Sequence, residues 1–203
     1  GSVPVSLPQI PFDGRRVIGF REVLSLEEVP SRMLVVGGGA IGLEMAFAFR
    51  KLGADVTVVE LMDRVLPAMD HSVSRAVHRS LERAGIRVLV RSTVTSSEVR
   101  EDSVRVRIST PEGELVEEFE RVLVAVGKRA PELPVDGSLG LELDQKGFVR
   151  VDDEMRTSVG WIWAAGDVTG PPFLAHRAYR QGLIAAESMA GKVTTWSPRF
   201  YPI

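Results

Sequence analysis

The stretch MLVVGGGAIGLEMA, Met33 to Ala46, decides the fold of this chain. It opens with four apolar residues in a row and no polar alternation, which is typical of a strand buried on both faces of a parallel sheet. Three glycines follow directly, and Ile41 to Leu52 then has the apolar density of a helix. The stretch therefore predicts a strand, a tight turn and a helix in immediate succession.

Within this stretch Gly37, Gly39 and Gly42 match the pattern G-x-G-x-x-G. In such loops the first glycine permits the turn, the second leaves room for a pyrophosphate beside the backbone, and the third lets the helix pack closely on the strand. The N–H groups at the helix start then face the phosphates, and the helix dipole favours negative charge there. Alone the pattern is weak evidence, because a tight turn can need the same glycines.

An acidic residue stands where a dinucleotide-binding fold needs one. A second apolar run, DVTVVE, ends at Glu60, eighteen residues after Gly42. A carboxylate there accepts hydrogen bonds from the adenosine ribose and repels a 2′-phosphate, so it favours NAD over NADP. Arg64 raises the NADP alternative, but we expect a surface ion pair for it. The other interpretation of Glu60 is a solvated strand end.

The residues after this second strand predict the rest of an α/β domain. Asp70 is a plausible cap for a helix over about residues 72–84, and a third strand follows at 86–90. Strands and helices that alternate with short joints imply right-handed crossovers and a parallel sheet.

The pattern then changes to alternating polar and apolar residues, which predicts an antiparallel meander over the segments 93–99, 103–109 and 114–120. Residues 121–126 are again continuously apolar and return to the sheet. We therefore expect a Rossmann-like, three-layer domain, with helices on one face of a parallel sheet and the β-meander on the other.

The two ends of the chain differ from this middle part. Residues 1–30 are rich in proline and predict an extended, looping lead-in. After a connecting loop we expect a strand near 148–151. The stretch IWAAGDVTGPPFLAHRAYRQG, residues 162–182, reads as a strand that stops at a glycine-aspartate pair, and a helix over about 175–190 follows.

Composition excludes several classes of function. With 25 basic against 27 acidic residues, we expect no nucleic-acid partner, and no apolar run reaches the ~18 residues of a membrane span. We expect a soluble, cytoplasmic protein without a membrane partner. The sequence has no cysteine, which excludes disulfides, thiolate metal sites and thiol nucleophiles, so redox chemistry must use a bound cofactor. We name no catalytic residue and no metal ligand.

Taken together, the motifs resemble a family. GGGAIGLE with VTVVE, VLVAVGKRAP, and VDDEMRTSVGWIWAAGDVTG with FLAHRA stand in the order of the flavoprotein pyridine nucleotide-disulfide oxidoreductases. They are most similar to the dihydrolipoamide dehydrogenases of that family, over nearly the whole chain. The resemblance implies a two-dinucleotide flavoprotein that passes electrons between a dithiol, FAD and NAD.

The resemblance implies two sets of cofactor-binding residues. Those for NAD are Gly37, Gly38, Gly39, Ala40, Ile41, Gly42, Leu43, Glu44, Glu60, Val94 and Gly127. Those for FAD are Asp167, Phe173, Leu174, Ala175 and His176. Glu44 would lie near the nicotinamide and Val94 would contact adenine, whereas Asp167 would contact the ribityl and pyrophosphate region of FAD. The other interpretation of Glu44 is a helix-surface carboxylate, and that of Val94 is a plain strand residue. Asp167 could be only part of a cap at its turn, and His176 an ordinary histidine at a helix start.

The FAD set includes a helix start, where N–H groups can stabilise negative charge on a reduced flavin. One departure concerns Gly127 to Pro131, GKRAP, which differs from the usual glycine-arginine-x-proline, so we assign no role to its basic residue.

The family also has parts that this sequence lacks: a first flavin loop with a redox cysteine pair, and a C-terminal dimerisation domain with a catalytic histidine and glutamate. We therefore expect residues 1–27 to be the exit segment of an FAD domain, 28–146 an NAD-binding domain, and 147–203 a returning FAD-domain segment. The chain alone would be inactive, bind NAD(H), bind FAD weakly or not at all, and be a monomer or weak dimer.

The parent enzyme that the resemblance implies oxidises dihydrolipoyl groups and reduces NAD through FAD and a cysteine pair. It would be a homodimer, a component of a 2-oxo acid dehydrogenase complex and part of cell redox homeostasis. One alternative is another flavin-dependent reductase or oxidase, such as a mercuric reductase or an NADH oxidase. Another, of a different class, is a non-catalytic NAD-sensing module.

Overall fold

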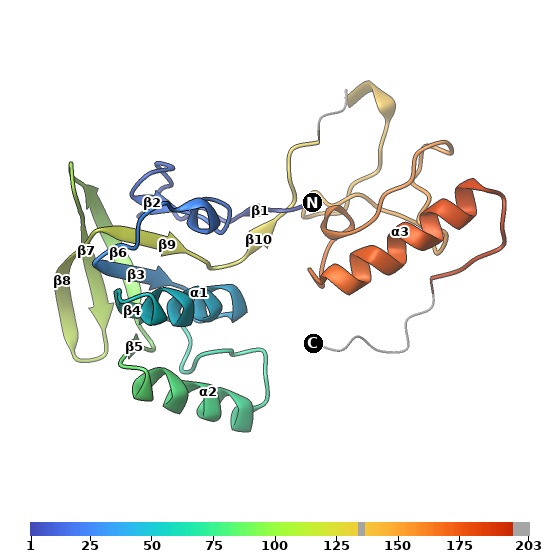
Figure 1. Cartoon of the computed structure of the whole chain (residues 1–203). Coiled ribbons are helices and arrows are strands. Elements are labelled where there is room, and N and C mark those ends of the chain that lie inside the picture. Colours follow the sequence, from blue (N-terminus) through green and yellow to red (C-terminus); the bar gives the residue numbers. More distant parts are fainter. Residues whose placement is uncertain (134–136, 197–203) are drawn as a thin grey trace. The chain divides into compact units, whose positions relative to one another are not determined.

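The chain divides into two compact units (Figure 1). The larger unit is Pro4–Gly127, and the smaller unit combines Gly1–Val3 with the chain from Lys128 onward. The computed structural model describes residues 1–133 and 137–196. Strands β1 (Val3–Pro4) and β10 (Lys128–Arg129) form a separate two-stranded sheet.

The larger unit is built on a five-stranded parallel sheet in the order β2-β9-β3-β4-β5. Its strands are β2 (Val17–Ile18), β3 (Arg32–Val36), β4 (Asp55–Val59), β5 (Arg87–Leu89) and β9 (Arg121–Val124). The central strand β3 lies between β4 and β9, so Met33 is beside both Val56 and Arg121. The predicted return of residues 121–126 to the sheet is confirmed.

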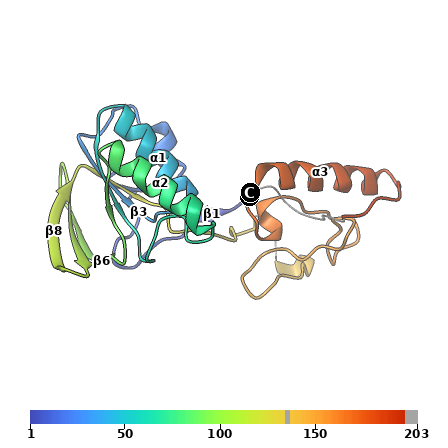
Figure 2. The same cartoon turned by 90° about the horizontal axis from the view of Figure 1, so that it is seen from below.

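Two helices cover one face of this sheet (Figure 2). They are α1 (Ala40–Lys51) and α2 (His71–Arg83). The predicted cap of α2 is confirmed, since an Asp70 carboxylate oxygen accepts a hydrogen bond from the Ser72 N–H at 2.7 Å. The N-cap residue of helix α1, by contrast, is Gly39, which has no side chain. The first N–H groups of α1 therefore have no acceptor from a side-chain cap.

The opposite face carries the predicted antiparallel meander, in the order β6-β7-β8. Its strands are β6 (Thr93–Val99), β7 (Val104–Thr110) and β8 (Gly113–Phe119). Alternate residues of β7, Val104, Val106 and Ile108, are fully buried against the parallel sheet, while the residues between them are exposed. The alternation in the sequence therefore marks one buried face.

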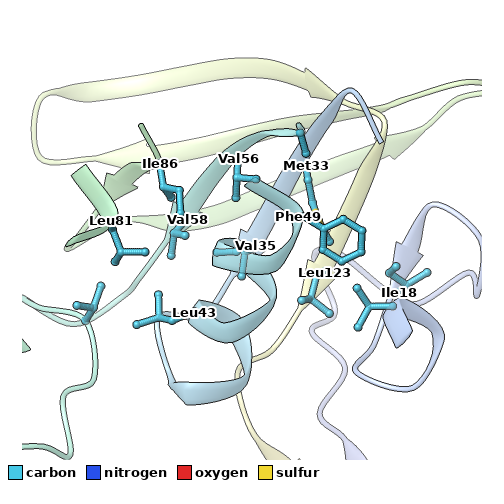
Figure 3. Packing of buried hydrophobic residues seen from close by; sticks show 14 residues of the cluster. Ile18, Met33, Val35, Leu43, Phe49, Val56, Val58, Leu81, Ile86 and Leu123 are labelled. Atoms are coloured by element: carbon cyan, nitrogen blue, oxygen red, sulfur yellow. The ribbon is translucent and has the colours of Figure 1, made fainter. Parts of the chain in front are cut away.

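The uninterrupted apolar run of β3 supplies both cores of the larger unit. Met33 and Val35 join the cluster beneath the helices, shown in Figure 3 with Leu43 and Phe49 of α1. Leu34 belongs to the other cluster, which lies between the sheet and the meander. A strand that is apolar on both faces thus lies at the centre of three layers, as the sequence predicted.

The smaller unit has a long helix, α3 (Ala175–Met189), and two short 3-10 turns, η2 (Gly137–Leu139) and η3 (Asp167–Thr169). Its cluster of buried apolar residues consists of Met155, Ile184 and Ala185, with Val151, Trp163 and Trp196 packed against them. The predicted helix over 175–190 is confirmed.

One expectation about the C-terminal part of the chain is wrong. The segments 148–151 and 162–165 form no named strand; among the described residues they make only the isolated bridges Leu143 with Val149 and Arg156 with Trp163. A strand needs a neighbour over several residues, and none pairs with these segments there. The predicted looping lead-in over residues 1–30 is largely confirmed, since its named elements are only the short strands β1 and β2 and the 3-10 turn η1 (Glu22–Ser25).

The limits of the compact units differ from the expected boundaries at 27/28 and 146/147, because β2 belongs to the sheet of the larger unit. Those boundaries describe NAD and FAD domains, and they stay a prediction. Within the described ranges, no helix is both long and apolar enough to cross a membrane.

Candidate cofactor-binding sites

The glycine loop follows β3 and contacts the ends of the neighbouring strands β4 and β9. Gly37 has φ of 111°, and its N–H donates a hydrogen bond to the Val59 carbonyl at 2.8 Å. A Cβ at Gly37 would come within 2.5 Å of the Ala125 carbonyl oxygen, at the end of β9. Both the positive φ and the close approach exclude any other residue, so this glycine makes the tight turn that the sequence predicted.

The other two glycines of the motif meet different surroundings. A Cβ at Gly42 would overlap the Gly37 carbonyl oxygen and lie 3.1 Å from Cγ1 of Val35, so Gly42 allows the helix to approach the strand and turn. A Cβ at Gly39 would meet no atom within 4 Å. Gly39 thus has open space beside it, next to an N-terminus of α1 that no side chain caps, and helix N-termini of this kind can bind anions.

Glu60 ends β4 and contacts the glycine loop directly. Its side chain is buried, at 8% exposure; Oε2 accepts a hydrogen bond from the Gly38 N–H at 2.6 Å, and Oε1 accepts one from the Met62 N–H at 2.8 Å. Glu60 is therefore not a solvated strand end. Each carboxylate oxygen keeps a lone pair for a further donor, such as a ribose hydroxyl.

The segment after Glu60 is also tied to the loop. The Leu66 N–H donates to the Gly38 carbonyl at 2.8 Å. Arg64 forms an ion pair with Asp63 at 3.1 Å and donates to the Pro67 carbonyl at 3.0 Å, so the expected ion pair is present. These contacts use Nη1 and Nη2 of the guanidinium, whereas Nε has no hydrogen-bond partner among the described residues.

The remaining residues predicted for NAD lie in varied surroundings. Glu44 is exposed on α1 and makes no hydrogen bond or ion pair with the residues that the structure describes. Gly127 has φ of 138°, and its carbonyl accepts from the Val5 N–H at 3.1 Å. The side chain of Val94 is 2% exposed and belongs to the core beneath the meander. Leu43 is likewise buried in the core beneath the helices.

The smaller unit has a separate polar cluster around Asp167. An Asp167 carboxylate oxygen accepts a hydrogen bond from the Ser2 hydroxyl at 2.5 Å and from the Lys128 ammonium at 3.2 Å. Burial raises the pKa of Asp167, but the hydrogen bonds from Ser2 and Lys128 outweigh it and lower the pKa below the usual value. Lys128 also lies over the Phe173 ring, 5.2 Å from its centre.

Two buried side chains of α3 hold the turn that carries Asp167. The Gln181 side-chain oxygen accepts from the Gly166 N–H at 2.9 Å, and Arg177 donates to the Gly170 carbonyl at 2.6 Å. Sequence reasoning found neither of them, nor Ser2 and Lys128; the only signal was the departure GKRAP, which marked Lys128 as unusual.

The other residues predicted for FAD lie at the start of α3. Leu174 is the N-cap residue of α3 and makes no side-chain capping hydrogen bond, while Ala175 and His176 are exposed. Phe173 packs against Phe148, with ring centres 5.7 Å apart. Across residues 1–133 and 137–196, no group of three or more histidine, aspartate or glutamate side chains could hold a metal ion.

Most of this chain matches known proteins. The family model of the pyridine nucleotide-disulphide oxidoreductases matches residues 1–182. The chain is 43% identical, over 95% of its length, to a dihydrolipoyl dehydrogenase of Chlorobaculum tepidum, of which it covers 41%. It is 37% identical over its whole length to one of Vibrio parahaemolyticus, of which it covers 43%.

Among solved structures, LpdA of Mycobacterium tuberculosis is similar with a TM-score of 0.82 and 30% identity. That match covers 96% of this chain and 42% of the LpdA chain. The chain thus spans about two fifths of the length of the relatives it matches.

Proposed function

We propose, since the chain belongs to the pyridine nucleotide-disulphide oxidoreductase family, that its larger unit binds NAD(H) in a dihydrolipoyl dehydrogenase-like flavoprotein. The observation that carries the proposal is the buried Glu60 carboxylate, hydrogen-bonded to the glycine loop beside the uncapped start of α1. An acceptor for ribose hydroxyls and donors for phosphate then lie on neighbouring segments.

Each part of the site has a separate task. The helix-start N–H groups after Gly39 would hold the pyrophosphate, and Glu60 would accept hydrogen bonds from the adenosine ribose. A 2′-phosphate would meet the buried carboxylate, and Arg64 is already engaged by Asp63 and Pro67, so the site favours NAD over NADP. NAD, when bound, supplies the hydride acceptor. Exposed Glu44 would lie near its nicotinamide ring.

Gly127 and Val94 complete the proposed NAD site. The Val94 side chain is buried in the core, so a contact of this residue with adenine would use its backbone.

We assign the smaller unit a contribution to an FAD site. Asp167 would face the ribityl and pyrophosphate region, with Lys128 offsetting its charge. Phe173 to His176 would bring a helix start near the flavin ring, where N–H groups can stabilise negative charge.

The activity of the whole enzyme goes beyond these residues. Oxidation of a dihydrolipoyl group through a cysteine pair needs thiols that this sequence does not contain. That activity, the homodimer, the 2-oxo acid dehydrogenase complex and the cytoplasmic location are therefore proposed for the longer protein, not for the 203-residue chain. A related NAD(P)H reductase or oxidase, or an NAD-sensing module, would share the same NAD site.

Calorimetric titration of the 203-residue chain with NADH and with FAD tests this proposal. We expect saturable NADH binding at one site and only weak FAD binding. Glu60→Ala should weaken NADH binding about 10- to 100-fold, because it removes charge-assisted hydrogen bonds. Asp167→Ala is the matched control and should leave NADH binding unchanged. Absence of NADH binding, or tight stoichiometric FAD binding, would overturn the proposal.

A further inference from the structure

Gly38, which lies between the first two glycines of the motif, has contacts that the motif does not require. Its N–H donates to Oε2 of Glu60 at 2.6 Å in a buried hydrogen bond, and its carbonyl accepts from Leu66. One residue of the glycine loop thus holds both the acidic side chain and the segment that follows it.

The atoms nearest to the space beside Gly38 belong to Glu60. A Cβ at Gly38 would lie 3.0 Å from Oε2 of Glu60 and 3.2 Å from its Cβ and Cγ. These three nearest atoms all come from one side chain. The backbone of Gly38 is outside the left-handed region, unlike that of Gly37, so alanine is compatible with its conformation. The space at this position is tight because of Glu60, not because of the turn, and a methyl group there would require the Glu60 side chain to shift by a few tenths of an ångström.

Glu60 has little freedom to make room for a methyl group by moving its backbone. Its N–H donates to the Leu89 carbonyl at 2.8 Å, and its own carbonyl accepts from the Ser92 N–H at 2.9 Å. Oε1 is held by the Met62 N–H at 2.8 Å. A methyl group at Gly38 must therefore displace the carboxylate itself.

We propose that Gly38 is a positioning residue that sets the preference of this site for NADH over NADPH. Its N–H orients one carboxylate oxygen of Glu60, and its missing side chain leaves the room that the carboxylate occupies. Held by Gly38 and Met62, the two oxygens present their remaining lone pairs to the vicinal hydroxyls of the adenosine ribose. The inference rests on the proposed NAD(H) site and adds the residue that fixes its selectivity.

Fluorescence titrations of the whole chain with NADH and NADPH test this role. Gly38→Ala should raise the Kd for NADH about tenfold and change that for NADPH less than about twofold, so that the preference narrows. Gly39→Ala is the matched control, because its methyl group would enter the space assigned to the pyrophosphate. It should weaken binding of both cofactors equally and leave the preference unchanged.

The substitution Glu60→Asp distinguishes an effect of Gly38 on the position of the carboxylate from a general effect on the structure. In a Glu60→Asp background the carboxylate is one methylene shorter, so Gly38→Ala should cost less than about twofold in NADH affinity. The double variant also serves if Gly38→Ala alone does not fold, because aspartate does not reach the position of Oε2, the nearest contact of the methyl group.

Equal losses for Gly38→Ala in the wild-type and Glu60→Asp backgrounds, or an unchanged NADH preference, would overturn the inference. So would a further loss of about fivefold or more in the double variant relative to Glu60→Asp alone. A wild-type chain that binds no NADH would instead refute the proposed function on which the inference depends.

Discussion

The two units of this chain differ in the extent of their buried apolar cores. In the larger unit, Leu34 and Val35 of β3 point to opposite faces of the sheet, and both are fully buried, one beneath the meander and the other beneath the helices. In the described part of the smaller unit, the buried apolar cluster consists of Met155, Ile184 and Ala185. The larger unit therefore has two extensive cores, while the smaller unit has one small core.

This difference corresponds to a difference between the sites. In the larger unit, the loop and acid of the candidate NAD site follow strands fixed in a continuous sheet. In the smaller unit, the turn with Asp167 is held by side chains, chiefly Gln181 and Arg177. We therefore expect the larger unit to be the more stable one and the one that binds its cofactor without further protein.

The two units can be followed separately by spectroscopy. The chain has three tryptophans, Trp161, Trp163 and Trp196, and all of them belong to the smaller unit. Tryptophan fluorescence therefore reports on that unit, while hydrogen exchange of the β3 and β4 segments reports on the larger one.

The largest expected effect on stability comes from adding a methyl group to a glycine of α1, and it should be opposite in sign to that of the same change in α3. Gly42→Ala should destabilise the larger unit by about 3 kcal/mol or more, because its Cβ would overlap the Gly37 carbonyl oxygen. Gly182→Ala in α3 should stabilise the smaller unit by about 0.5–1 kcal/mol, since no atom lies within 4 Å of its Cβ. Urea unfolding followed by exchange and fluorescence measures both; effects of the same sign would contradict the contrast.

The next largest effect comes from removing a side chain that holds the turn with Asp167. Gln181→Ala leaves the buried Gly166 N–H without its acceptor and should destabilise the smaller unit by about 1–3 kcal/mol. The midpoint of tryptophan fluorescence should fall while NADH binding stays unchanged. Gln145→Ala, at an exposed position, is the control. A loss of NADH affinity in Gln181→Ala would show that the two sites are not independent.

The smallest effect is the response of the smaller unit to acid. The pKa of Asp167 is lower in the folded chain than its ordinary value of 3.8. Its stabilising contribution is therefore fully present above that value and is lost as the pH falls through the folded pKa. Asp167→Asn should flatten the acid dependence of the tryptophan fluorescence midpoint.

Asp13 is the matched control in the larger unit. Burial raises its pKa, but the backbone N–H groups of Arg15, Val17 and Arg16 outweigh that effect and lower it. Asp13→Asn should therefore change the acid dependence of the larger unit only. If the acid dependence of the smaller unit were unchanged in Asp167→Asn, the Asp167 carboxylate and its ion pair with Lys128 would contribute nothing to the stability of that unit.

The sequence predicted the larger unit well because its signals are local. The apolar run before Gly37 indicates a buried strand, and alternation along residues 104–110 indicates a strand with one buried face. Strand β2 was missed, because two residues, Val17 and Ile18, are too few to show a period. The strands expected near 148 and 162 failed for a related reason, since an apolar run shows a preference for burial but not a partner strand.

The candidate sites divide in the same way. Spacing along the chain identified Gly37, Gly42 and Glu60, because the motif itself carries that information. The contact between Gly38 and Glu60 depends on the alignment of β3 with β4, and the contact between Ser2 and Asp167 joins residues 165 positions apart. Spacing does not encode such pairs.

Hydrogen exchange of the 203-residue chain with and without saturating NADH tests the central claim most directly. We predict slower exchange on NADH binding at residues 37–44, 60–66 and 125–127, all in the larger unit, and no change at residues 166–176. Protection at 166–176, or none in the glycine loop while NADH binds, would contradict the assignment of the NAD(H) site to the larger unit.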